Sequence, residues 1–168
     1  MQYKVLDGVP TLIAINEGAE LLTELFLKIK RIELDGTTYE VLSKNIKSSH
    51  VDVGYSNQLH NYEFATLWMG LNQANHKLYL SAKPNERTEL LNRIVVGNVL
   101  SFFKSIGLRL ADDQRILAMT NLAAKSTRFK DKDMLAFEGG FVVNALLPSG
   151  IGLGKAVSRG FGTLLNPK

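Results

Sequence analysis

Gly150-Ile-Gly-Leu-Gly154-Lys155-Ala-Val-Ser158-Arg159-Gly160-Phe-Gly162, near the C-terminus, combines five glycines with a lysine, a serine and an arginine in thirteen residues. Glycine has no Cβ, so such a backbone can approach a phosphate closely and present its N–H groups to it. Lys155 and Arg159 would add positive charge, which indicates a polyanionic ligand. The alternative is a flexible glycine turn that joins two strands.

The spacing of this stretch fits neither of two common nucleotide-binding motifs. A Walker loop has four residues between its first glycine and the Gly-Lys pair, and then Ser or Thr. Here three residues separate Gly150 from Gly154, and Ala156 follows the lysine. A dinucleotide-binding fingerprint opens a helix inside a βαβ unit, but only six residues follow Gly162. We therefore do not expect a nucleotide held by either fold.

Composition limits the class of protein. The 168 residues suit one larger domain or two small ones, and 45% of them are hydrophobic. The chain has no cysteine, which excludes disulfides, thiolate catalysis and cysteine-ligated metals. No apolar run reaches membrane-spanning length, and the N-terminus does not begin a secretory signal. We expect a cytoplasmic protein that does not bind membranes.

Positive charge is concentrated in the half that contains the glycines. Residues 1–84 hold 8 Lys or Arg and 9 Asp or Glu, whereas residues 85–168 hold 12 and 7. This asymmetry favours nucleic acid over an acidic small molecule as the polyanion. Ordinary surface charge that keeps the protein soluble is the alternative.

Apolar spacing and turn residues predict an α+β fold. Apolar side chains recur at intervals of three and four in residues 19–29 and 86–106, which predicts two helices. Asn16 is placed to cap the first helix, which we expect to pack on a sheet. Asp-Gly pairs at 7–8 and 35–36 predict hairpins. The expected strands are 2–6, 9–15, 32–34, 39–42, 62–71, 115–120, 123–129 and 134–147.

The polar stretch 43–61 predicts a linker or a long loop between two domains. We place the domains at 1–58 and 59–168. Each would be a small sandwich of one sheet and one principal helix.

Four groups of residues lie at characteristic spacings along the chain. They are Tyr62-x-Phe64-x-Thr66-x-Trp68 with Leu71-Asn72-Gln73-x-Asn75; Gly97-Asn98-x-Leu100-Ser101-x-x-Lys104-x-x-Gly107; Phe137-x-Gly139-x-Phe141-x-x-Asn144; and the glycine-rich stretch after Pro148. In these groups the sequence resembles the CRISPR RNA-processing endoribonucleases of the RAMP superfamily. The glycine-rich stretch is the most specific of the four.

The resemblance implies two tandem ferredoxin-like (RRM-like) domains. It also implies binding of CRISPR repeat RNA and metal-independent cleavage of precursor CRISPR RNA in antiviral defence, without a cofactor. In similar proteins the usual catalytic histidine lies in a region upstream of the point that matches Met1. We therefore expect a first domain that is incomplete at its N-terminus and pairs with a second copy or a second chain.

Two alternative functions remain open. One is an RNA-binding module that does not cut. The other is a structural or scaffold subunit whose glycine-rich stretch docks a protein partner.

The expected RNA contacts form two groups. On the glycine-rich stretch, backbone approach and polar side chains would hold phosphate. In a strand-like stretch, cations would form one wall of a groove, with a solvated strand face as the alternative. The residues are Gly152, Gly154, Lys155, Ser158, Arg159 and Gly160, and then Lys125, Arg128, Lys130 and Lys132.

Other side chains have one functional and one structural interpretation. His50 and His60 are candidate acids or bases, since histidine has an unperturbed pKa near 6.5; the alternative is surface or loop histidines, as for His76. Aromatic side chains could stack on bases or fill the core. Amides could contact base edges or make turn hydrogen bonds. The aromatic residues are Tyr62, Phe64 and Trp68, and the amide residues are Asn72, Gln73 and Asn75.

Overall fold

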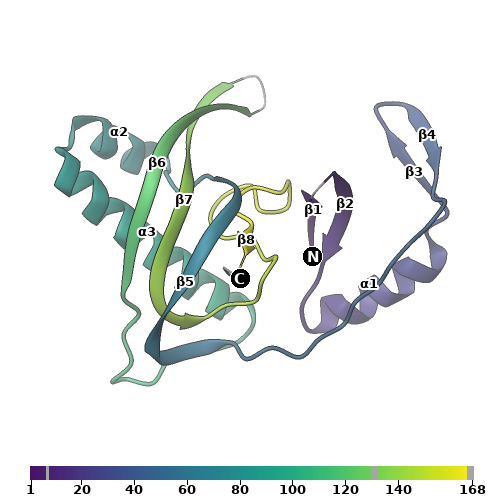
Figure 1. Cartoon of the computed structure of the whole chain (residues 1–168), viewed down its shortest axis with the longest axis horizontal. Helices are drawn as coiled ribbons and strands as arrows, with labels where there is room; N and C mark the ends of the chain where they lie inside the picture. Colours follow the sequence, from purple (N-terminus) through teal and green to yellow (C-terminus); the bar gives the residue numbers. More distant parts are fainter. Residues whose placement is uncertain (7, 130–131, 166–168) are drawn as a thin grey trace.

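A computed structural model describes residues 1–6, 8–129 and 132–165 of the chain. It has three helices and eight strands within these residues, which confirms the expected α+β class (Figure 1). In chain order the elements are β1 (Gln2–Leu6), β2 (Val9–Ile13), α1 (Glu17–Lys28), β3 (Arg31–Leu34), β4 (Thr37–Glu40), β5 (Gly54–Trp68), α2 (Gln73–Ser81), α3 (Pro84–Ser105), β6 (Ala118–Phe129), β7 (Lys132–Leu146) and β8 (Leu164–Leu165).

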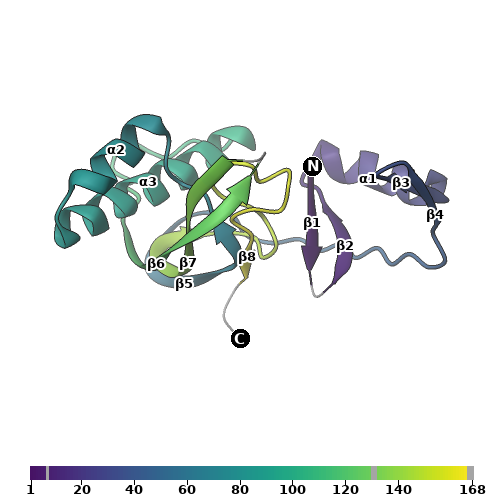
Figure 2. The same ribbon diagram turned by 90° about the horizontal axis from the view of Figure 1, so that it is seen from above.

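The C-terminal part forms one four-stranded antiparallel sheet in the order β6-β7-β5-β8. Helices α2 and α3 connect β5 to β6 and lie together on one side of this sheet (Figure 2). This is the βαββαβ arrangement of a ferredoxin-like domain, with one difference. The glycine-rich stretch, instead of a helix, connects β7 to β8.

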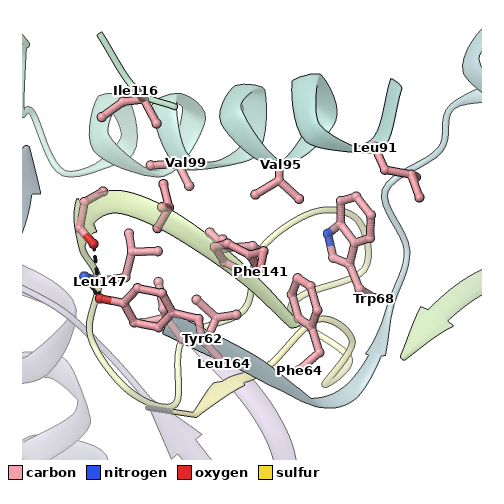
Figure 3. Close-up of a cluster of buried hydrophobic side chains, with 14 of the residues drawn as sticks. Tyr62, Phe64, Trp68, Leu91, Val95, Val99, Ile116, Phe141, Leu147 and Leu164 are labelled. Carbon is pink, nitrogen blue, oxygen red and sulfur yellow. Dashed lines mark hydrogen bonds between the residues drawn. The ribbon is translucent and has the colours of Figure 1, made fainter. Parts of the chain in front are cut away.

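The core lies between this sheet and α3. Trp68 and Val99 are completely buried, and the rings of Phe64 and Trp68 stack at 5.5 Å (Figure 3). The Tyr62 hydroxyl donates to the Ala145 carbonyl at 3.2 Å and accepts from the Leu147 N–H at 2.9 Å. The predicted strand aromatics are thus core residues, and their expected alternative role in base stacking is wrong.

The N-terminal half consists of two antiparallel hairpins on either side of α1. The Asp-Gly prediction is confirmed at Asp35 and Gly36, which have φ of 50° and 77° as a tight hairpin turn requires. Gly8 also has a positive φ of 78°, and Asp7 lies outside the described residues.

Helix α1 is confirmed, but its expected packing on a sheet is wrong. None of its twelve residues, all of which the structure describes, is buried, and Leu27 is 71% exposed. The two neighbouring sheets have only two strands each, so no broad sheet face lies beneath the helix. Asn16 takes the N-cap position with φ of 54°, but its side chain makes no capping hydrogen bond.

The expected loop at 43–61 is only partly correct. Residues 41–53 have no regular structure, whereas β5 begins at Gly54, so the position between residues 58 and 59 lies inside a strand. The first half of β5, residues 54–61, carries polar side chains because many of its residues are exposed to solvent. Three further elements differ from the prediction. Helix α2 was not expected, and β6 is one continuous strand where two were expected. Residues 115–117, expected in a strand, precede β6 and have no regular structure.

No helix in the described part of the chain is both long enough and apolar enough to span a membrane.

Candidate nucleic-acid interface

The glycine-rich segment, residues 148–163, folds back on itself beside β8. The N–H of Gly150 donates to the Leu164 carbonyl and the N–H of Leu164 donates to the Ile151 carbonyl, both at 2.7 Å. The N–H of Leu153 donates to the Gly162 carbonyl at 2.9 Å. The segment therefore connects two strands, as the alternative interpretation proposed, but it is a hydrogen-bonded loop joined to the sheet and not a flexible turn.

Close packing explains the glycine at position 154. A Cβ there would lie 2.7 Å from Trp68 Nε1 and 3.1 Å from Asn98 Oδ1, and φ is +92°. Trp68 Nε1 donates to Asn98 Oδ1 at 3.2 Å. Because Gly154 lies against this pair, the segment is held to both β5 and α3. Ile151 and Leu153 on either side of Gly152 are buried in the core.

Most backbone amides of this segment are already used inside the protein. The N–H of Gly152 donates to Gln2 Oε1 at 2.7 Å, that of Lys155 to the Met69 carbonyl at 2.9 Å, and that of Gly160 to the Val157 carbonyl at 3.2 Å. The expectation that Gly152 and Gly160 offer open N–H groups to phosphate is therefore wrong. The glycines shape the segment instead.

What the segment presents to solvent is its polar side chains. Lys155, Ser158 and Arg159 are all exposed. They lie in the turn between the two buried runs of the segment, at 150–153 and 162–164. The structure thus brings these three predicted residues together at the surface.

The N-terminal hairpin docks on the same segment (Figure 1). β1 forms a parallel bridge between Tyr3 and Arg159. Lys4 is completely buried, and its Nζ donates to Thr163 Oγ1 at 3.1 Å. Thr163 Oγ1 in turn donates to the Gly160 carbonyl at 3.0 Å. The hairpin and the segment therefore form one continuous polar contact.

Lys4 is a residue that sequence reasoning missed. Among the described residues, no carboxylate forms an ion pair with it. Burial therefore lowers the pKa of Lys4 from 10.5 to about 8. Its sequence context, Gln-Tyr-Lys-Val-Leu in a short strand, gives no sign of this burial.

Of the second expected group of cations, Lys125 and Arg128 can be compared, and these two do not lie on one face. Lys125 and Arg128 are three residues apart in β6, so their side chains lie on opposite faces of the strand. Lys125 Nζ pairs with Glu138 Oε1 of β7 at 2.9 Å. Arg128 is exposed. Lys130 lies outside the described residues.

The three histidines lie in three different elements. His50 is exposed in the connection at residues 41–53, and His76 lies in α2. His60 is half-buried in β5, with its Nε2 2.9 Å from Ser56 Oγ. Between Tyr55 and His60 the pairing of β5 with β7 is irregular, and Ser56 Oγ accepts from the Gln58 N–H there at 3.0 Å.

Among the three candidate amides, Asn72 has a structural role that the structure shows. Asn72 is the N-cap of α2, where its Oδ1 accepts from the Asn75 N–H at 2.7 Å, so its turn interpretation is confirmed. Within the part of the chain that the structure describes, no group of three or more His, Asp or Glu side chains could hold a metal ion.

Family models match both parts of the chain. The model of the Cas6b C-terminal domain matches residues 54–166, and that of the Cas6b N-terminal domain matches residues 1–52. The break between the two matches falls where β5 begins. An uncharacterized protein of Methanocaldococcus jannaschii is 29% identical over 144 residues, which are 84% of this chain and 96% of that protein.

Two solved structures are similar over 99% of this chain. A crystal structure of Cas6b is 31% identical with a TM-score of 0.91, and the match covers 76% of its chain. A crystal structure of the CRISPR RNA processing endoribonuclease Cas6b is 30% identical with a TM-score of 0.85, and 80% of it is covered. Since the family models and the fold agree over both halves, the chain belongs to the Cas6b family.

Proposed function

We propose that this chain binds CRISPR repeat RNA and takes part in the processing of CRISPR RNA. The observation that carries the proposal is the likeness of the whole chain, at 31% and 30% identity, to two Cas6b structures, one of them of a CRISPR RNA processing endoribonuclease. The basic C-terminal half and the exposed Lys155, Ser158 and Arg159 support it.

In this proposal the glycine-rich segment contacts the RNA backbone through side chains. The Lys155 ammonium and the Arg159 guanidinium are suited to phosphate oxygens, and the Ser158 hydroxyl can donate a further hydrogen bond. Gly152, Gly154 and Gly160 set the path of the backbone that carries these groups. Arg128 and Lys125 are the next candidates, on separate faces of β6.

Cleavage requires more than binding. In metal-independent cleavage the 2′-oxygen attacks phosphorus, the P–O5′ bond breaks, and a 2′,3′-cyclic phosphate and a 5′-hydroxyl form. One group must take the proton from the 2′-hydroxyl and another must give a proton to the leaving 5′-oxygen. We propose His60 as the first position to test, because it is half-buried, held by Ser56 and placed at an irregularity of β5. His50 is the second candidate, and it lies on the exposed connection.

The test uses labelled repeat RNA from the CRISPR array of the source genome, in EDTA. Tight binding of repeat RNA, compared with a scrambled RNA of equal length, supports the central proposal. One internal cut, lost in His60→Ala and kept in His76→Ala, supports the role of His60. Binding without any cut would show that the chain is an RNA-binding module that does not cleave, and it would reject the proposed role of His60 in cleavage. Equal binding of both RNAs rejects the function.

We also propose that a second copy of this chain covers the N-terminal half. Apolar side chains are exposed on its hairpins and on α1, at Val9 (60%), Leu21 (52%), Leu27 (71%) and Tyr39 (53%). Isolated two-stranded hairpins are marginally stable, so a partner surface would stabilise them. Light scattering after size-exclusion chromatography measures the mass. A dimer supports this proposal, whereas a monomer across the micromolar range rejects it, and a stable complex with another protein would favour the scaffold alternative.

A further inference from the structure

A surface groove lies where α2, α3 and the glycine-rich segment meet. It has a volume of about 590 Å³, and its walls come from the start of α2, the middle of α3 and the Gly154-Lys155 step. The groove is on the same side of the sheet as the helices, as Figure 2 shows for α2 and α3.

The charged residues that line the groove are both cations. They are Arg93 from α3 and Lys155 from the glycine-rich segment, and no Asp or Glu lies among the described lining residues. Both side chains are exposed. Neither forms an ion pair within the part of the chain that the structure describes. The groove therefore has a positive potential that no neighbouring carboxylate on its walls offsets.

Two of the polar side chains that line the groove retain donors only, whereas the Ser101 hydroxyl donates to the Gly97 carbonyl at 2.8 Å. Asn98 uses its Oδ1 to accept from Trp68 Nε1, and Asn72 uses its Oδ1 to accept from the Asn75 N–H. Each amide therefore retains its NH₂ group, which can only donate. Two cations and two amide NH₂ groups match the acceptor oxygens of a phosphodiester.

The floor of the groove is apolar. Leu90 is buried, Leu78 is 57% exposed, and Ile94 is half-buried and packs against the core. An exposed leucine beside a cluster of donors suits a ligand with one charged end and one flat or apolar part. A nucleotide unit has this character, since its phosphate is anionic and its ribose and base are less polar.

We propose that this groove binds a phosphate and the adjoining nucleoside of the RNA strand that passes Lys155. The proposal rests on the proposed function, because it places a second contact on the same RNA. Lys155 would be shared by the glycine-rich segment and the groove, and Arg93 would extend the contact along α3. A planar guanidinium can form two parallel hydrogen bonds to phosphate, which a lysine cannot.

Arg93→Ala tests this placement through the affinity for labelled repeat RNA. We expect about tenfold weaker binding, and a decrease of about 0.7 in the slope of log K against log salt, the value for one phosphate contact on a single strand. Arg109→Ala is the control, because Arg109 is exposed beyond the C-terminus of α3 and does not line the groove. It should change the affinity less than twofold. Arg93→Lys should recover only part of the loss.

A second measurement separates this proposal from the function on which it rests. Nitrogen-15 NMR follows a titration with a hexameric uridine oligonucleotide, which needs no repeat sequence. Shifts of the Asn98 side-chain amide and the Gly154 backbone amide that disappear in Arg93→Ala support the groove, even where the wild type shows no preference for repeat RNA. Shifts confined to other surfaces, or equal affinities of Arg93→Ala and Arg109→Ala for RNA, overturn it.

Discussion

Replacement of Lys4 by methionine should stabilise the protein at neutral pH. The Lys4 ammonium is completely buried, donates to Thr163 Oγ1 and has no carboxylate partner among the described residues. Methionine has a similar length and no charge, so Lys4→Met removes the cost of desolvating the ammonium. Thr163 Oγ1 keeps its hydrogen bond to the Gly160 carbonyl in the variant.

The magnitude follows from the lowered pKa. The pKa of Lys4 is about 8 in the folded protein and 10.5 in its ordinary state. Between these values the unfolded chain binds the proton and the folded chain does not, so the free energy of unfolding rises with pH. Integrated from pH 7 to 9.5, the difference in bound protons between the unfolded and the folded chain is about 1.5. It raises the free energy of unfolding by about 2 kcal/mol. The full difference between the two pKa values sets an upper limit of about 3 kcal/mol for the increase in the free energy of unfolding that Lys4→Met gives at pH 7.

Urea unfolding of both proteins at pH 7 and 9.5 measures this effect. Trp68, the one tryptophan of the chain, reports the transition by fluorescence. The wild type should become more stable relative to Lys4→Met as pH rises, because other groups titrate alike in both proteins. Carbon-13 NMR of the lysine Cε signals gives the pKa directly. A Lys4 pKa near 10.5, with parallel pH dependences of the two proteins, would refute the reasoning.

Two further predictions concern the core and the glycine-rich segment. Gly154→Ala should destabilise the protein by about 2–4 kcal/mol, because the new Cβ would lie 2.7 Å from Trp68 Nε1 at a φ of +92°; a loss below 0.5 kcal/mol in urea unfolding would contradict this packing. Tyr62→Phe should cost about 1–3 kcal/mol, since it leaves the buried Leu147 N–H without the hydroxyl that it donates to. Burial raises the pKa of Tyr62, so stability due to this residue falls once pH exceeds 10, and Tyr62→Phe should lack that fall. Equal stability of Tyr62→Phe and wild type would show that water or another acceptor replaces the hydroxyl.

Long-range apolar periodicity predicted the long helix well. α3 runs from Pro84 to Ser105, and its predicted face, which includes Val95, Val99 and Phe103, is buried. The shorter α2 was missed because its nine residues include none that is buried, so it shows little apolar pattern. β6 was predicted as two strands, and Asn121, which falls between them, is exposed, whereas its neighbour Thr120 donates to Asn92 Oδ1 of α3.

The surface exposure of the candidate residues was predictable from the sequence, but the packing around them was not. The sequence showed cations among glycines, and Lys155 and Arg159 are indeed exposed. It did not show that the glycines serve close packing on Trp68, because that contact joins residues far apart in the chain. Nor did it show Arg93 beside Lys155, since tertiary packing alone brings α3 to the segment.

The central claim is that this chain recognises CRISPR repeat RNA, and an affinity measurement tests it most directly. Fluorescence anisotropy in EDTA compares labelled repeat RNA with a scrambled RNA of the same length over a series of salt concentrations. We predict at least about tenfold tighter binding of the repeat RNA, with an affinity that falls as salt rises because phosphate contacts release counterions. Equal affinities for the two RNAs, or binding to neither of them, would contradict the claim.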